Sequence, residues 1–180
     1  MKKTLALLSL LTAFNVGQAA QLSYTTAELD EFLDGVYAEI YAENQTNSQS
    51  VATGASYVLI TNFMANGDSS HCTPDYANDK VTITKNGEYV LSINTSFTST
   101  VTGGGDNWFG AIFAGGVELG DIHFERKITN GGDHGVACAS GFFSVTNAPI
   151  DIDFRMRHDD GGSLDLTKTY MNLSAHRIGL

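Results

Sequence analysis

The sequence predicts an all-β protein with antiparallel strands, and three observations lead to this prediction. Short segments in which apolar and polar residues alternate recur from about residue 55 to the end of the chain, and such alternation is typical of strands with one buried face. Turn signals rich in Gly, Asn and Asp separate these segments roughly every 8–15 residues. A helical period is seen only before residue 45. About ten strands in a sandwich or barrel are therefore expected.

The clearest strand is at residues 150–157, where apolar residues alternate with Asp and Arg. Asn86-Gly87 is typical of a two-residue hairpin turn, and Gly115-Gly116 marks a second turn. The other predicted strands lie at residues 57–64, 81–84, 89–98, 107–114, 117–128, 136–145 and 164–180.

The last segment, from Thr169 to Leu180, keeps a strand pattern to its end. Leu173 and Ala175 alternate with the small polar residues Asn172 and Ser174. Most chain ends are polar and fray into solvent. We therefore expect this last strand to be held inside a sheet.

The first 19 residues have the pattern of a secretory signal peptide. Lys2 and Lys3 precede an apolar run, and Gly17-Gln18-Ala19 is a cleavage site of small residues. The run is too short to span a membrane, so the mature protein is expected to be exported to the periplasm or the extracellular space without membrane insertion.

Residues 20–44 are expected to form a short α-helix. Thr25 and Glu28 fit a capping box. An apolar seam with spacings of four, three and four residues follows and is typical of a coiled coil; it consists of Leu29, Leu33, Val36 and Ile40. Two heptads are too short to be stable alone, so the helix would either pack on its own domain or act as a stalk that joins copies of the chain. Residues 45–54 are expected to be a polar linker.

The only two cysteines are Cys72 and Cys138. In an oxidising compartment an isolated pair most simply forms a disulfide, so a Cys72–Cys138 bond is expected. Their spacing from the scattered histidines does not fit a zinc site.

The order of segments from residue 55 to 180 resembles the complement-one-q globular head, a branch of the tumour-necrosis-factor-like jelly-roll superfamily. The stretch NGEYVLSINTSFTS resembles that family's third-strand region, and WFGAIFAGGVEL lies where it has a central hairpin. The end YMNLSAHRIGL is similar to bacterial members that end in ANLSVxRIG. Asn147-Ala148-Pro149 replaces the family's Gly-Asp turn, and no collagen-like stalk is present.

The resemblance implies an antiparallel jelly-roll sandwich of about ten strands that assembles as a homotrimer. The last strand would lie near the threefold axis, with Tyr170, Asn172 and Ser174 at the trimer interface. The apolar seam at residues 29–40 would then trimerise a short helical stalk.

Several heads of this family bind calcium through loop carboxylates, and Asp106, Asp159 and Asp160 are the candidates here. Alternatively, Asp159 and Asp160 simply form a turn. Trp108 follows a glycine-rich loop. It would contact a ligand if exposed, and it would belong to the core if buried.

With 20 acidic and 10 basic residues, the formal net charge of −10 argues against nucleic-acid binding. No nucleophile motif or metal-binding histidine pair occurs, so we expect no enzyme activity and no cofactor other than possible calcium. The function expected is multivalent binding of a surface glycan or protein by a secreted trimer. The alternatives are a phage or appendage structural protein, such as a fibre tip or decoration knob, and a cupin-like enzyme, which would need clustered His and Glu.

Overall fold

The computed structural model describes residues 35–51, 53–54, 56–100, 105–130, 132–159 and 162–179. The chain divides into two units, Met1–Asp30 and Glu31–Leu180, and all described residues belong to the second. The predicted signal peptide and residues 20–34 of the predicted helix lie outside the described residues. In the part that is described, no helix is long and apolar enough to cross a membrane.

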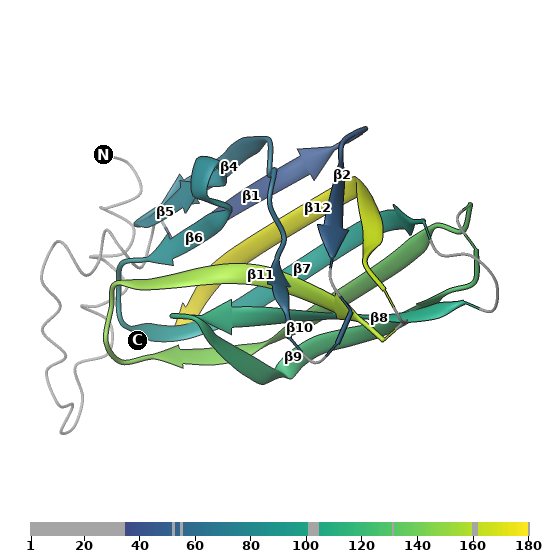
Figure 1. Cartoon of the computed structure of the whole chain (residues 1–180). Helices are drawn as coiled ribbons and strands as arrows, with labels where there is room; N and C mark the ends of the chain where they lie inside the picture. Colours follow the sequence, from purple (N-terminus) through teal and green to yellow (C-terminus); the bar gives the residue numbers. More distant parts are fainter. Residues whose placement is uncertain are drawn as a thin grey trace, which may run out of the picture. The chain divides into compact units, whose positions relative to one another are not determined.

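The described part is an all-β sandwich of two antiparallel six-stranded sheets, as predicted (Figure 1). It has twelve strands instead of about ten. These are β1 (Tyr37–Glu43), β2 (Ser48–Val51), β3 (Val58–Leu59), β4 (Ala65–Ser70), β5 (Cys72–Asp75), β6 (Lys80–Ile83), β7 (Gly87–Ser99), β8 (Asp106–Ala114), β9 (Val117–Ile128), β10 (Gly135–Val145), β11 (Ile150–His158) and β12 (Leu164–Gly179).

One sheet, the β12 sheet, has the order β10-β7-β12-β1-β4, with β2 also paired to β12. The other, the β11 sheet, has the order β5-β6-β11-β8-β9, with β3 also paired to β11. The core between them includes Ile93, Phe97, Phe154 and Leu173, all fully buried.

The last strand is held inside a sheet, as predicted. β12 pairs with β7 on one side and with β1 and β2 on the other. Met171, Leu173 and Ala175 are buried, whereas Asn172 and Ser174 point to the other face of the sheet and are half-buried.

The prediction of a helix as far as residue 44 is wrong for residues 37–43, which form β1. Ala38, Ile40 and Ala42 are buried in alternation, and the strand pairs with β12 and β4. The backbone N–H and C=O groups of β1 bond to β12 and β4. In a lone short helix they would have had to bond to one another. Gly35 has φ +74°, a left-handed conformation that ends a helix.

Residues 45–54 are likewise not a free linker. β2 pairs with β12 in one sheet, Thr53 bridges to His158 of the other sheet, and β3 then pairs with β11. We call residues 45–63 the strap, because this segment passes from the β12 sheet to the β11 sheet.

The predicted Asn86-Gly87 hairpin is also wrong. β6 belongs to the β11 sheet and β7 to the β12 sheet, so this turn carries the chain from one sheet to the other. Gly115-Gly116 does close a hairpin, between β8 and β9, with positive φ at both glycines.

The predicted disulfide is wrong: Cys72 and Cys138 are both free. Cys72 lies on β5 with its side chain buried, and Cys138 lies on β10 of the other sheet with its side chain exposed. The two thiols therefore belong to different sheets and point to different environments, which the spacing of two cysteines along a sequence does not reveal.

Candidate functional site

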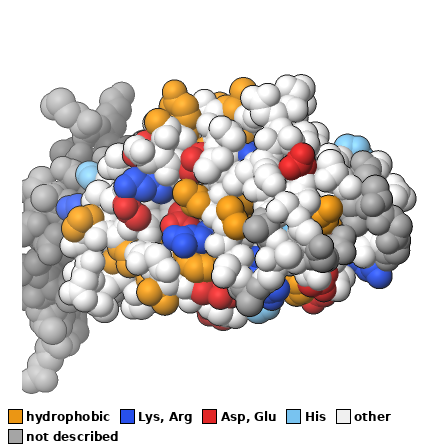
Figure 2. Space-filling model, viewed as in Figure 1, with side chains coloured by type: hydrophobic (Ala, Val, Ile, Leu, Met, Phe, Trp, Pro, Cys, Tyr) orange, Lys and Arg blue, Asp and Glu red, His pale blue; other side chains and the backbone are white. Residues whose placement is uncertain are grey.

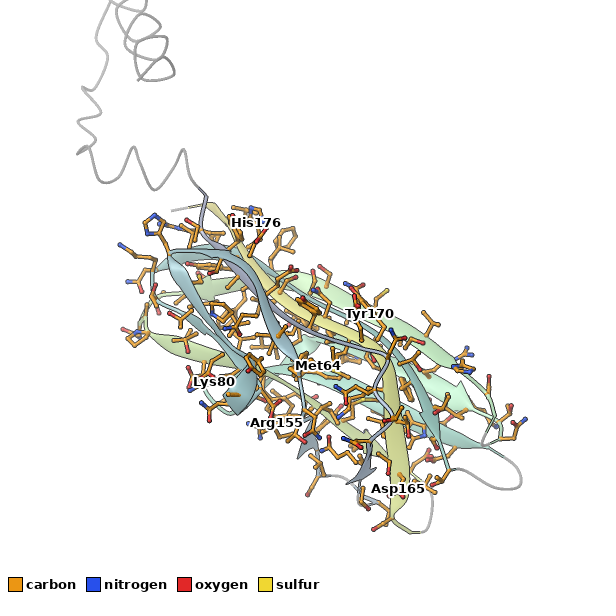
Figure 3. The ribbon with its side chains drawn as sticks, turned by 90° about the horizontal axis from the view of Figure 1, so that it is seen from above. Met64, Lys80, Arg155, Asp165, Tyr170 and His176 are labelled. Atoms are coloured by element: carbon orange, nitrogen blue, oxygen red, sulfur yellow. The ribbon has the colours of Figure 1, made fainter. Side chains whose placement is uncertain are left out.

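The outer face of the β12 sheet is almost free of charged side chains. On β10, β7 and β12 it carries Ser, Thr, Asn, apolar and aromatic residues, in a chain in which 17% of residues are charged. The acidic residues on this face are at its margins: Glu39 and Glu43 on β1, Glu88 at the start of β7 and Asp165 at the start of β12. Figure 3 shows Tyr170 and His176 along β12, which both belong to this face.

Polar side chains on this face are linked across the strands. Ser92 Oγ and Ser140 Oγ lie 2.9 Å apart and join β7 to β10. Asn172 Nδ2 donates to Glu39 Oε2 at 2.8 Å and joins β12 to β1. The predicted interface residues Tyr170, Asn172 and Ser174 therefore lie together on one surface.

The same face ends in exposed apolar side chains on its edge strand. Val136 and Phe142 on β10 are each 71% exposed, and Tyr170 on β12 is 41% exposed. Large apolar side chains exposed next to a neutral polar surface are typical of protein–protein contacts. The sequence analysis missed this edge because alternation alone does not say which face of a strand is covered.

The predicted stalk seam is not a separate interface in the described residues. Val36 and Ile40 are 2% and 0% exposed and belong to the core of the sandwich, so neither is available to a coiled coil. Leu29 and Leu33 lie outside the described residues.

Two of the three predicted calcium ligands do meet, at one end of the sandwich where β8 begins and β11 ends. The backbone N–H of Asp159 donates to Asp106 Oδ1 at 3.3 Å, and Asp159 accepts from the backbone and the side chain of Asn107 at 2.9 Å each. Asp160 lies outside the described residues. Within the described ranges, no group of three or more His, Cys, Asp or Glu could hold a metal ion.

Asp106 is instead paired with a buried histidine. His158 Nδ1 lies 3.2 Å from Asp106 Oδ2, and both side chains are completely buried. Burial, together with the neighbouring Asp159 carboxylate, raises the pKa of Asp106 to about 6. Asp159 shows the opposite shift, because its hydrogen bonds with Asp106 and Asn107 lower its pKa to about 2. At pH values between these two pKa values, Asp159 is therefore charged and Asp106 is mainly neutral.

Trp108 is fully buried, so its side chain belongs to the core, as the second alternative predicted, and it is not the exposed contact residue that the first alternative required. Its ring lies 5.0 Å from the His158 ring and 5.7 Å from the Phe97 ring. A glycine-rich loop precedes Trp108 in the sequence, but Trp108 is already on the inward-facing side of β8, and its side chain therefore lies in the core.

A buried lysine is the feature that the sequence analysis missed most completely. Lys168 on β12 points into the sandwich and is 1% exposed. Its ammonium donates to the Thr61 carbonyl and to Gln49 Oε1 of the strap. Burial lowers the pKa of Lys168 to about 8, while Asp79 opposes this shift. No motif signals such a residue, because its partners lie 119 and 107 residues away.

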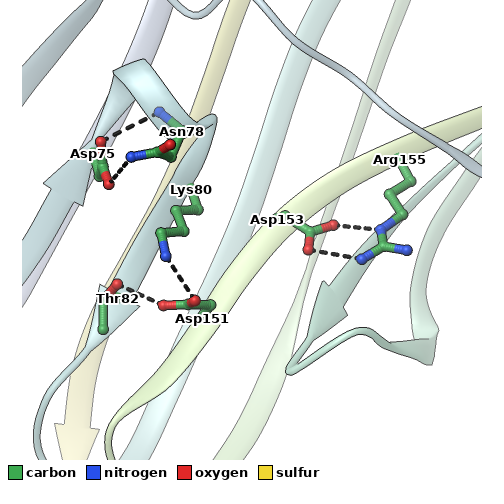
Figure 4. A network of polar contacts seen from close by, with 7 residues as sticks. All are labelled: Asp75, Asn78, Lys80, Thr82, Asp151, Asp153 and Arg155. Carbon is green, nitrogen blue, oxygen red and sulfur yellow. Dashed lines mark hydrogen bonds and ion pairs between the residues drawn. The ribbon is translucent and has the colours of Figure 1, made fainter.

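The outer face of the β11 sheet has the opposite character. Figure 2 shows acidic and basic side chains interspersed with hydrophobic ones on the face viewed in Figure 1. Lys80 Nζ lies 2.8 Å from Asp151 Oδ2, and Arg155 pairs with Asp153 (Figure 4). This face resembles an ordinary solvated surface more than a subunit contact.

Comparison with known proteins bears on the fold. No protein-family model matches the chain, and no curated protein matches it. Among solved structures, the globular domain of zebrafish complement 1qA protein is similar with a TM-score of 0.54 and 13% identity, over 80% of this chain and 97% of that chain. The PRD1 vertex protein P5 is similar with a TM-score of 0.50 and 15% identity, over 80% and 97%. Murine APRIL at pH 5.0 has a TM-score of 0.46 and 10% identity, over 79% and 99%.

At these identities the likeness concerns the fold alone. The protein has a jelly-roll fold similar to that of a complement-type globular domain, which confirms, at the level of the fold, the resemblance inferred from the order of its segments.

Proposed function

We propose that this protein is an exported, non-enzymatic binding protein that acts as a homotrimer of jelly-roll heads. The observation that carries this function is the nearly uncharged outer face of the β12 sheet, bordered by exposed Phe142 and Val136. An ordinary solvated surface mixes charges of both signs, whereas the centre of a subunit interface is depleted of them and enriched in aromatic residues. Burial of this face against neighbouring copies accounts for its composition.

Threefold symmetry is favoured over other assemblies by the fold. The complement-type resemblance implies a trimer in which the last strand lies near the axis, and here β12 runs through the middle of the neutral sheet. Three identical sites on one rigid head raise the avidity for a repetitive surface by about 10²–10⁴-fold over a single site. A surface glycan or a surface protein is the kind of ligand that such a head captures.

Two features support binding rather than catalysis. The one His–Asp pair in the described ranges, His158 and Asp106, is closed to solvent, so a substrate does not reach it. Two of the structurally similar proteins, with TM-scores of 0.54 and 0.50, are by their titles a complement globular domain and a vertex protein. Export rests on the pattern of residues 1–19.

A second candidate is a structural protein of a virion or appendage. The likeness to the PRD1 vertex protein P5 favours it, because that protein's title places a similar fold at a particle vertex. A signal sequence that is removed during export favours the binding protein, and a retained N-terminus inside an assembled particle favours the structural protein.

The experiment that tests the proposed function is the native mass of the mature protein, residues 20–180, by light scattering after size exclusion. We expect a mass of three chains, followed by binding to immobilised surface glycans or proteins that weakens when the trimer dissociates. A mass of one chain at micromolar concentration would overturn the trimer and with it the multivalent mechanism. Sequencing the N-terminus of the protein recovered from the medium or the periplasm decides between the two candidates.

A further inference from the structure

Two arginines on the outer face of β11 differ in their partners. Arg155 and Arg157 are two residues apart and point to the same side of the β11 sheet. Arg155 Nε lies 2.6 Å from Asp153 Oδ1, and its Nη2 lies 3.0 Å from Oδ2 (Figure 4). This bidentate pair satisfies and neutralises the Arg155 guanidinium.

Arg157 has no such partner. Among the described residues, no carboxylate oxygen lies within 4.0 Å of its guanidinium. The group is positioned by aromatic rings, with its central carbon 3.9 Å from the centre of the Phe109 ring and 5.3 Å from the centre of the Tyr57 ring. The guanidinium also contacts the Tyr57 hydroxyl through a side-chain hydrogen bond that lowers the pKa of that phenol. This bond and the cation–π contacts hold the side chain in place, and its other N–H donors have no carboxylate partner among the described residues.

We propose that Arg157 binds the carboxylate of an acidic sugar, such as a uronic or sialic acid, on a surface glycan. The inference rests on the proposed binding function and names the chemical class of its ligand. A planar guanidinium that is ordered before binding loses little conformational entropy when a carboxylate docks on it, and it offers two parallel N–H donors to the two oxygens.

The surroundings of Arg157 favour a sugar over an acidic peptide. β11 is paired with β3 on one side of this region and with β8 on the other, so β11 itself has no free backbone edge to bind an extended peptide. Glu125 lies opposite Phe109 on β9. Burial raises the pKa of the Tyr57 phenol, and the nearby Glu118 carboxylate adds to this shift. A peptide with several carboxylates would be repelled by these two residues. A sugar with a single carboxylate also carries several hydroxyl groups, which donate hydrogen bonds to Glu118 and Glu125.

Arg155 provides a matched control for the experiment, since it is on the same strand and face and stacks on Phe113 at 4.3 Å. Wild-type protein and the variants R157Q, R157K and R155Q would be titrated against sialyllactose and methyl galacturonoside, which carry one carboxylate each, with lactose and the methyl ester of the galacturonoside as uncharged counterparts. The native mass and the melting temperature of each variant show whether the head remains folded and assembled.

We expect wild-type protein to bind an acidic probe more tightly than its uncharged counterpart. R157Q should lose roughly ten- to hundredfold in affinity, the range of a charged hydrogen-bonded pair. R157K should lose most of this, because an ammonium does not reproduce the bidentate contact, and R155Q should stay within about threefold.

Equal binding of acidic and uncharged probes, or equal losses in R157Q and R155Q, would overturn the role of Arg157 in ligand choice. The same holds if neither acidic probe binds. The proposed function is judged separately, by the trimeric mass and by capture of neutral glycans or surface proteins, so it can stand when this inference fails.

Discussion

Lys168 Nζ lies 3.3 Å from Gln49 Oε1 inside the sandwich, and this contact ties the last strand to the strap. Gln49 is held in turn by the strap, since its Nε2 donates to the Leu59 carbonyl at 2.6 Å and its Oε1 accepts from the Thr61 N–H at 2.9 Å. The buried ammonium therefore organises a segment that crosses between the two sheets. Because this ammonium is buried and its pKa is lowered, the stability of the folded protein depends on pH.

Replacing Lys168 with Met should abolish a rise of stability with alkaline pH. Burial lowers the pKa of Lys168 in the folded state to about 8 from a usual value of 10.5, so the unfolded chain binds more protons between these two values. Stability then increases as pH rises through this window, by at most about 3 kcal/mol for a shift of this size. Urea unfolding of wild type and K168M at pH 7.5 and pH 10 measures the difference; parallel changes in both proteins would contradict the shift.

The fluorescence of Trp108 should report the charge of Asp106. Trp108 is the only tryptophan in the chain, and its ring lies 5.0 Å from His158, which contacts Asp106. Because the pKa of Asp106 is raised to about 6, emission from the native protein should change with a midpoint near pH 6. Asp106→Asn should remove the transition, and Asp159→Asn should shift it to lower pH by removing the neighbouring carboxylate. A midpoint that survives in D106N would assign the change to another group.

The same carboxyl group has a defined effect on stability. A folded-state pKa above the unfolded value of 3.8 means that the folded protein binds more protons between pH 3.8 and about 6, so Asp106 makes its stabilising contribution below pH 3.8 and loses it as pH rises through 6. Asp159, with its pKa lowered to about 2, contributes above pH 3.8 and loses that contribution as pH falls toward 2. Urea unfolding of wild type and D106N at pH 4 and pH 7 measures the Asp106 slope, and unfolding of wild type and D159N at pH 2 and pH 4 measures the opposite Asp159 slope.

Introducing a charge at the exposed edge of the β12 sheet should dissociate the trimer. Phe142→Glu places a carboxylate on the proposed interface, where desolvation costs several kcal/mol, whereas the side chain is 71% exposed in a single chain. Val117→Glu is a matched control, because Val117 is 68% exposed but lies on β9 of the other sheet. We expect the native mass to fall to one chain in F142E and to stay unchanged in V117E. The same mass for both variants would place the interface elsewhere.

The two thiols should react at very different rates. Cys138 is exposed on β10, whereas Cys72 is buried and burial raises its pKa, which reduces both access and thiolate content. A thiol reagent should label one cysteine per folded chain quickly and the second only in denaturant. Peptide mapping should place the fast label on Cys138 in the free subunit, obtained as F142E. If neither cysteine is labelled in denaturant without reductant, the two thiols are not free, which would contradict the structure.

The β class and the interior position of the last strand were predictable because they depend on local alternation. β11 shows this best: Ile152, Phe154 and Met156 are fully buried in the register that the pattern predicts. β1 was missed because its residues fit two periods at once. Ile40 completes a heptad seam with Val36, and it also alternates with Ala38 and Ala42. The positive φ of Gly35 and the pairing with β12 decide between them, and pairing is a long-range property.

The polar contacts were largely unpredictable for the same reason. Asp106 and Asp159 were identified as loop carboxylates and do meet, but neither their unequal pKa values nor the burial of His158 follows from sequence spacing. The charge-free face of the β12 sheet could have been found by collecting the polar residues between the apolar ones on β7 and β12. These residues form one surface only once the strand order is known, because the paired residues of β7 and β12 are 67 to 91 positions apart in the chain.

Ending the chain after Thr169 should prevent folding. The remaining strands would lose the segment of β12 that pairs with all of β1 and with the first part of β7, and the core would lose Met171 and Leu173, which are fully buried. Each such side chain contributes about 2–5 kcal/mol, so the two together match a large part of the 5–15 kcal/mol that stabilises an ordinary domain. Removing only Gly179 and Leu180 is the control, because it leaves the pairing with β1 intact. Circular dichroism and thermal unfolding should show a cooperative transition for the short deletion and none for the long one, and a cooperative melt of the chain ending at Thr169 would show that β12 is dispensable to the sandwich.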